Sequence, residues 1–374
     1  MVCLESPGQS RELINFFPVS IDKPAKQANP RTILPKAPPV HAFPEHPASW
    51  YLFAHFDALR KGPLTKMILG RRLVAFRTES GRVAVLDAHC SHLGADLGRG
   101  EVVGETIRCP FHHWRFGCDG RCEEIPSAND IPPFARQTTY PVAVRHGCVF
   151  FFNGPEALFP LPFFDGEDPE AFAASRPFSF STWGTWYMLA AQGFDAQHFE
   201  TVHNRRLLAP SRVDYPAPFA RRNRYHAEIV GTSLADRLLR ATVGSTVEVS
   251  IVNWGGTMFT VKAQFPRACS RFFISSQPLD DEHTRCDAIV YALRGAGALS
   301  LPLRRWLTRA HLVPEADQLR YTQYRPGRFI PADADMVACF QWLAELPQQK
   351  AEVGVAAPRR TQTAVNAEAT TYGP

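Results

Sequence analysis

The stretch CSHLGADLGRGEVVGETIRCPFHHW, residues 90–114, decides how the rest of the chain is interpreted. It holds two pairs of potential metal ligands: Cys90 with His92, and Cys109 with His112. Two cysteines and two histidines can bind a tetrahedral zinc ion, or a [2Fe–2S] cluster in which the cysteines hold one iron and the histidines the other. Zinc sites of this type usually take both cysteines from one pair. Here each pair supplies one cysteine and one histidine, which favours the [2Fe–2S] cluster.

The composition of the whole chain agrees with a metal protein of two domains. Its 374 residues are 45% hydrophobic, which is enough to bury a sizeable core. A net charge of +5 without long runs of one sign gives no support to nucleic-acid binding. Nine cysteines are an odd number for a disulfide framework. No apolar run is long enough to span a membrane, and Glu5 and Glu12 lie where a signal peptide would be apolar, which predicts a cytoplasmic protein.

The chain changes character at several points, and these points predict its domains. Residues 1–48 are rich in proline, which predicts an extended arm. Residues 49–155 contain short β runs separated by turns, including two around Gly81, and predict an all-β domain. The next part, 156–346, begins with a linker over 161–178, and residues 347–374 predict a mobile tail.

Residues 156–346 mix strand and helix patterns. This mixture predicts an α+β fold, in which helices pack on an antiparallel sheet. The expected strands lie in 245–265 and 271–293, and the expected helices in 185–203, 300–324 and 333–345.

A second group of potential ligands lies in QGFDAQHFETVH, which contains Asp195, His198 and His203. On a regular helix the two histidines would be about 140° apart, too far round for one ion. The helix must therefore end, or take a π-type turn, between them. Two imidazoles and one carboxylate on one side of Fe(II) leave positions open for O2, so a third ligand is expected elsewhere in the chain. Asp195 could instead accept a hydrogen bond from a ligand histidine.

The boxes CSHLG and CPFHHW resemble those of Rieske proteins, and with FDAQHFETVH they make residues 49–345 similar to the α subunit of Rieske non-haem iron oxygenases. The group that includes aminopyrrolnitrin oxygenase and ketosteroid hydroxylases is particularly similar. The resemblance implies a [2Fe–2S] cluster and a mononuclear Fe(II) bound by His198 and His203. His113 and Gln192 depart from the glycine and the asparagine common in the family.

The resemblance also indicates where the third iron ligand lies. The family places a carboxylate late in the chain, about nine residues before an aromatic of the final helix. This favours Asp333, with Trp342 as the aromatic, over Asp335. Whichever aspartate is not the ligand is expected to cap the helix.

The implied activity is mono-oxygenation of a hydrophobic or aromatic small molecule by hydroxylation, N-oxidation or demethylation. A reductase or ferredoxin would bring electrons from NAD(P)H to the cluster, and Asp195 would bridge to the iron of a neighbouring subunit in a homotrimer. The alternative is a Rieske electron-transfer protein without oxygenase activity. Two points stay open: whether Trp254, Met258, Phe259, Phe272 and Phe273 line a pocket or a core, and whether the basic helix near 300–311 touches a membrane or only packs.

Overall fold

The computed structural model describes residues 34–297 and 299–348. Most of the predicted tail and most of the predicted arm therefore lie outside the described residues. Between residues 34 and 48 the chain is largely irregular, with one short 3-10 turn at Val40–Ala42. This agrees with an extended segment there, because the prolines prevent regular helix and strand pairing.

The N-terminal part is built from three small antiparallel sheets, as the short β runs predicted. Its most buried strand is Cys148–Phe152, in which every residue is at most 2% exposed, so its unbroken apolar sequence matches its environment. The sheets are β1–β11–β10, β2–β3–β4–β9 and β5–β6–β7–β8. Their strands are β1 (Trp50–His55), β2 (Leu64–Ile68), β3 (Arg71–Arg77), β4 (Val83–Asp87), β5 (Glu101–Val103), β6 (Thr106–Arg108), β7 (Arg115–Phe116), β8 (Cys122–Glu124), β9 (Thr139–Tyr140), β10 (Val142–Arg145) and β11 (Cys148–Phe152).

The C-terminal part is organised around one nine-stranded antiparallel sheet, which confirms the predicted α+β class. Its order is β12-β20-β19-β18-β17-β16-β14, while β13 also pairs with β20 and β15 with β16. The strands are β12 (Phe172–Ala174), β13 (Phe178–Trp183), β14 (Arg205–Leu207), β15 (Arg212–Ala217), β16 (Ala220–Ile229), β17 (Thr246–Trp254), β18 (Met258–Gln264), β19 (Cys269–Pro278) and β20 (His283–Leu293).

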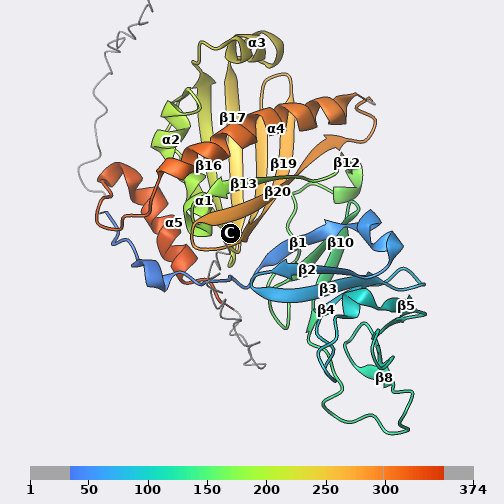
Figure 1. Cartoon of the computed structure of the whole chain (residues 1–374). Coiled ribbons are helices and arrows are strands. Elements are labelled where there is room, and N and C mark those ends of the chain that lie inside the picture. The colour runs from blue at the N-terminus through green and yellow to red at the C-terminus, as the bar shows by residue number, and fades with distance from the viewer. Residues whose placement is uncertain (1–33, 298, 349–374) are drawn as a thin grey trace, which may run out of the picture. The chain divides into compact units, whose positions relative to one another are not determined.

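Helices cover one face of this sheet. α4 (Ser300–Gln318) runs across the strands, and Leu312 packs with Phe178 and Val290 of β13 and β20 (Figure 1). α1 (Trp186–Gln192) and α5 (Ala334–Ala344) pack together in another cluster on the sheet. Two further helices, α2 (Ala196–Thr201) and α3 (Leu234–Val243), complete the set of α-helices among the described residues.

The opposite face of the large sheet packs against the N-terminal part. Trp50 and Phe150 of β1 and β11 share one apolar cluster with Phe273 of β19. Two polar contacts fix this packing: the Leu52 N–H donates to Ser275 Oγ at 3.0 Å, and Thr257 Oγ1 donates to the Trp50 carbonyl at 3.1 Å. Buried polar groups need such partners, and these two contacts supply them.

The segment 161–178, predicted as a linker, is more ordered than expected. Phe164 and Phe172 are buried in the same cluster as Trp50. Within the segment, β12 pairs with the edge of β20, and Phe172 lies opposite Leu293. The acidic and proline residues suggested an exposed connection, but its phenylalanines need burial and bring the backbone onto the sheet edge.

Candidate metal centres

The chain changes direction between α1 and α2, and this turn positions His198. α1 ends at Gln192, and Asp195 then caps α2 by accepting the His198 N–H on Oδ1 at 3.0 Å. A hydrogen bond to the sheet fixes this turn, because Tyr225 Oη on β16 donates to the Gly193 carbonyl at 3.0 Å. A side chain at Gly193 would meet Ile251 Cγ2 at 3.0 Å, so the close approach of turn and sheet favours glycine.

The helix ends between the two predicted histidine ligands, as their spacing required. α2 stops at Thr201, and Asn204 follows with a positive φ of 52°. His203 is therefore free to turn back toward His198, and their ring centroids lie 4.9 Å apart at an interplanar angle of 88°. One continuous helix could not bring the two imidazoles together in this way.

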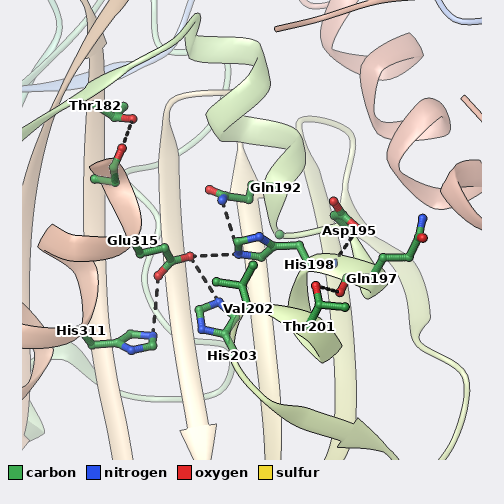
Figure 2. A network of polar contacts seen from close by, with 12 residues as sticks. Thr182, Gln192, Asp195, Gln197, His198, Thr201, Val202, His203, His311 and Glu315 are labelled. Carbon is green, nitrogen blue, oxygen red and sulfur yellow. Dashed lines mark hydrogen bonds and ion pairs between the residues drawn. The ribbon is translucent and has the colours of Figure 1, made fainter. Parts of the chain in front are cut away.

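Glu315 joins the two histidines from α4 (Figure 2). Its Oε1 lies 3.4 Å from Nε2 of His198 and 3.3 Å from Nε2 of His203. The three side chains are between 14% and 19% exposed. Burial alone would raise the pKa of Glu315, but hydrogen bonds from His198 and His203 outweigh it and lower the pKa. The carboxylate of Glu315 is therefore ionised at a position where it could bind one metal ion together with both histidines.

Asp333, the predicted third ligand, lies elsewhere, and this is a correction. Its Oδ2 accepts the Ile330 N–H at 2.8 Å, and its Oδ1 accepts from Gln197 Nε2 at 2.6 Å. Asp335 instead contacts Ser211. Among the described residues, the potential metal-binding group of three is His198, His203 and Glu315. Asp333 has the position of a residue that caps a helix start, which is why its sequence context resembled that of a ligand.

Two more side chains surround this group. His311, one turn before Glu315 on α4, places Nε2 3.6 Å from Oε2, the carboxylate oxygen that faces away from the other histidines. Gln192 Nε2 lies 3.4 Å from His198 Nε2. Pro314 lies inside α4, directly before Glu315, where it removes one backbone N–H from the helix.

These three residues suit a mononuclear iron site. Two imidazole nitrogens and one carboxylate oxygen gathered on one side are the donor set of the facial triad of non-haem Fe(II) oxygenases. His198 lies on α2, His203 just after its end and Glu315 on α4, so the site forms only when α4 lies across the sheet beside α2. The sequence offered one usable signal for Glu315, namely its spacing of four residues from His311 on a predicted helix.

The first group of ligands also comes together. Cys90 and Cys109 are 3% and 2% exposed and belong to one buried cluster, while the rings of His92 and His112 lie 4.7 Å apart. Burial raises the pKa of the Cys90 thiol to about 12, and the adjacent Cys109 contributes. Only a bound metal would keep such a thiol deprotonated.

The histidines lie at the outer side of this group. His92 stacks on Trp114 at 4.4 Å, and its buried Nδ1 has no hydrogen-bond partner in the protein. An unpartnered buried ring nitrogen is costly unless a metal occupies it. Two buried thiols beside two adjacent imidazoles fit a [2Fe–2S] cluster with one iron held by each kind of ligand.

The backbone conformation of His113 explains why glycine is common at this position in the family. It has a positive φ of 59°, and its N–H donates to the Cys109 carbonyl at 3.2 Å. The turn that returns the chain from the second box to β7 thus requires the left-handed region, which glycine adopts without cost. This chain places a larger residue there under backbone strain.

Comparison with known families agrees with this geometry. Residues 49–136 match the family of the Rieske [2Fe-2S] domain. They are a Rieske domain. The Rieske domain holds all four predicted cluster ligands and the whole β5–β6–β7–β8 sheet.

Two of the curated relatives are named as oxygenases. Aminopyrrolnitrin oxygenase PrnD of Pseudomonas fluorescens is 38% identical over 165 residues, which cover 42% of this chain and 46% of the relative. The oxygenase component of 3-ketosteroid-9-alpha-monooxygenase of Rhodococcus rhodochrous is 34% identical over 144 residues, which cover 36% of this chain and 37% of the relative. The chain thus spans less than half the length of each of these two relatives.

Solved structures extend the likeness beyond the Rieske domain. Dicamba monooxygenase bound to dicamba superposes with a TM-score of 0.60 at 19% identity, over 81% of this chain and 98% of that chain. Caffeine-bound NdmA of Pseudomonas putida CBB5 gives 0.57 at 18% identity, over 79% and 89%. The chain shares the fold of these proteins over 81% and 79% of its length.

The five side chains that could line either a pocket or the core pack against the core. Met258 and Phe273 are at most 2% exposed and contact the Rieske domain, and Phe259 packs with α1 and α5. Phe272 lies beside the α4 cluster. Burial of these side chains accounts for their composition without a ligand.

Proposed function

We propose that this chain is the oxygenase component of a Rieske non-haem iron oxygenase, which mono-oxygenates a hydrophobic or aromatic small molecule. In this proposal residues 49–155 form the Rieske domain and 156–346 the catalytic domain. The observation that carries it is the convergence of His198, His203 and Glu315 in a chain that also holds a Rieske domain. A protein that only carries electrons would have no use for this second donor set.

Each donor set has one task in the proposal. Cys90, Cys109, His92 and His112 would hold the [2Fe–2S] cluster, and His198, His203 and Glu315 would hold Fe(II). When bound, these groups supply single-electron transfer and O2 activation. Glu315 would neutralise part of the charge of a bound ion, and Asp195 fixes the start of α2 and with it the direction of His198.

The partners follow from the relatives. The relative from Rhodococcus is named as an oxygenase component, so a separate reductase or ferredoxin, fed by NAD(P)H, is proposed as the electron donor here. The relatives and neighbours act on or bind different compounds, among them a ketosteroid, dicamba and caffeine. A hydrophobic or aromatic substrate is the class that we propose. A homotrimer, with Asp195 as the bridge between subunits, completes the proposal.

The test is the metal content of anaerobically purified protein. We expect about three irons and about two acid-labile sulfides per chain, and about two of each in the His203→Ala variant. The control is His226→Ala, an exposed histidine on β16 that should leave both values unchanged. About two irons per chain in both wild type and His203→Ala would show that no mononuclear iron is bound, and would favour a protein that only transfers electrons. Zinc without sulfide would contradict the whole proposal.

A further inference from the structure

The proline-rich segment that precedes the Rieske domain inserts one aromatic ring among rings of the C-terminal part. Phe43 is 9% exposed and stacks on Tyr187 of α1, with ring centroids 3.9 Å apart and an interplanar angle of 5°. Tyr324 meets the same ring edge-on at 5.3 Å, and Phe340 of α5 does so at 6.1 Å. Stacked and edge-on pairs are the favoured geometries of aromatic rings, so these contacts fix both the position and the orientation of Phe43.

Two side chains of the C-terminal part also bind the backbone on either side of Phe43. Tyr324 Oη donates to the Pro38 carbonyl at 2.6 Å, and Trp186 Nε1 donates to the Pro44 carbonyl at 3.2 Å. Between them Pro39 has φ −71° and ψ 158°, which is the polyproline II conformation. A proline-rich segment leaves its carbonyls free and is recognised by aromatic rings, so the contacts of residues 38–44 are those of a bound ligand.

The two tyrosines that contact Phe43 belong to the two segments that supply the candidate iron ligands. Tyr187 lies in α1, and the turn after α1 leads directly to His198 at the start of α2. Tyr324 follows α4, nine positions after Glu315. The tyrosine rings also meet each other edge-on at 5.5 Å. The ring of Phe43 therefore lies where the segment that leads to one ligand contacts the segment that follows another.

We propose that residues 38–44 act as a clamp on the mononuclear metal site, with Phe43 as a positioning residue. The clamp acts through the two tyrosines, because it fixes the α1 segment against the segment that follows α4. Without the ring of Phe43 a void would separate these segments, and His198 and Glu315 would be held less precisely relative to each other. The inference rests on the iron site proposed above and adds a residue that controls how tightly this site binds its ion.

Linkage gives the clamp a property that a purely structural contact lacks. If docking of residues 38–44 tightens metal binding, then metal binding must tighten their docking by the same factor. Two amide groups can report this docking: the Ala42 N–H donates to the Pro39 carbonyl at 3.0 Å, and the Phe43 N–H donates to the Val40 carbonyl at 3.3 Å. Their hydrogen exchange measures how often this turn opens.

The first measurement is the affinity of the full chain for Co(II), in competition with a chelator. Phe43→Ala should bind Co(II) roughly tenfold more weakly than wild type, while its acid-labile sulfide content stays unchanged. Phe43→Leu, which keeps much of the apolar volume, should recover part of the loss. The matched control is Phe53→Leu, which removes a ring that is 1% exposed in the Rieske domain. It should lower the free energy of unfolding and leave the affinity for Co(II) unchanged.

The second measurement is hydrogen exchange of a peptide that contains Ala42 and Phe43. In wild type, Co(II) should slow this exchange by roughly the same tenfold factor. Tyr324→Phe keeps every ring and removes only the hydrogen bond to the Pro38 carbonyl, so it tests the clamp even if Phe43→Ala does not fold. It should speed the exchange roughly fivefold and weaken Co(II) binding.

The outcomes separate the clamp from the iron site on which it rests. If wild type binds Co(II) but Phe43→Ala binds it equally well, the clamp is overturned and the iron site stands. Exchange that Co(II) does not change in wild type would overturn the clamp in the same way. Wild type that binds no Co(II) would contradict the iron site itself, and the clamp with it.

Discussion

Glu315 Oε1 lies 3.4 Å from Nε2 of His198, although 117 positions of the sequence separate the two residues. His203 reaches the same oxygen at 3.3 Å. The carboxylate that reaches both histidines comes from α4 and not from α5, the last helix of the described residues. This relationship determines which substitutions should remove the mononuclear iron.

Glu315→Ala should lower the iron content from about three to about two per chain, while the sulfide content stays at about two. The reason is that only two protein donors remain at the site. Asp333→Ala should keep all three irons, because that carboxylate contacts Ile330 and Gln197 instead. If Asp333→Ala lost iron and Glu315→Ala retained it, Asp333 and not Glu315 would be the third iron ligand.

His311→Ala should weaken binding of the mononuclear metal by about 10- to 100-fold. His311 lies beside Oε2 of Glu315 and within 5.1 Å of the His203 ring, so it limits how the carboxylate can rotate. Competition of the protein with a chelator for Co(II) measures this affinity without any need for substrate. His311→Gln, which can still donate a hydrogen bond, should recover part of the loss. Unchanged affinity in His311→Ala would exclude a positioning role.

Asp195 combines a structural and a proposed catalytic role, and two variants separate them. Asp195→Ala removes the cap of α2 and should cost about 1 kcal/mol of stability together with some iron. Asp195→Asn keeps an oxygen for the His198 N–H, so stability and iron should stay near wild type. If the carboxylate bridges electron transfer, product formation falls in both variants. Product formation at the wild-type rate in Asp195→Asn would exclude the bridging role, and Asp195 would then serve only as the cap of α2.

Glu167→Gln should lower the free energy of unfolding by about 2 kcal/mol at neutral pH. Glu167 receives hydrogen bonds from Arg271 at 2.6 Å and from Lys262 at 2.6 Å. Burial would raise its pKa, but these two partners outweigh burial and lower it. The stabilisation is therefore complete above the pKa of the unfolded chain and is lost as pH falls through the lowered native pKa.

Denaturant titrations at several pH values check this prediction. The difference between wild type and Glu167→Gln should shrink in acid and reach a plateau near neutral pH. Glu170→Gln, an exposed residue three positions later, serves as the control and should change stability little. A difference that does not depend on pH would contradict the ionic origin of the effect.

Much of this fold could be predicted from local patterns. The β runs around Gly81 became β3 and β4, and the runs in 245–265 and 271–293 became the four central strands of the large sheet. The spacing of His198 and His203 required a helix end, and α2 ends between them. Such features depend on neighbours in the sequence, so period and spacing contain the information.

The proposed third iron ligand could not be predicted in the same way. The only local signal for Glu315 is its spacing of four residues from His311, and the crossing of α4 over the sheet is what brings it to the histidines. Asp333 had the stronger signature because a helix cap and a ligand use the same residue type. The segment 161–178 was underestimated for a related reason, since its strand β12 exists only by pairing with β20.

Pro314 makes the attachment of Glu315 softer than the rest of α4. The missing N–H leaves the carbonyl of Ala310, four residues earlier, without its usual helical donor. A helix bends most easily at such a point, which in α4 lies directly before Glu315. Leu312 packs on the sheet on one side of this point, and the Ala316 carbonyl accepts from Thr182 on the other. Bending at Pro314 would change the distance from the carboxylate to an ion bound there, so the stiffness of one helical turn would influence how readily such an ion exchanges its ligands.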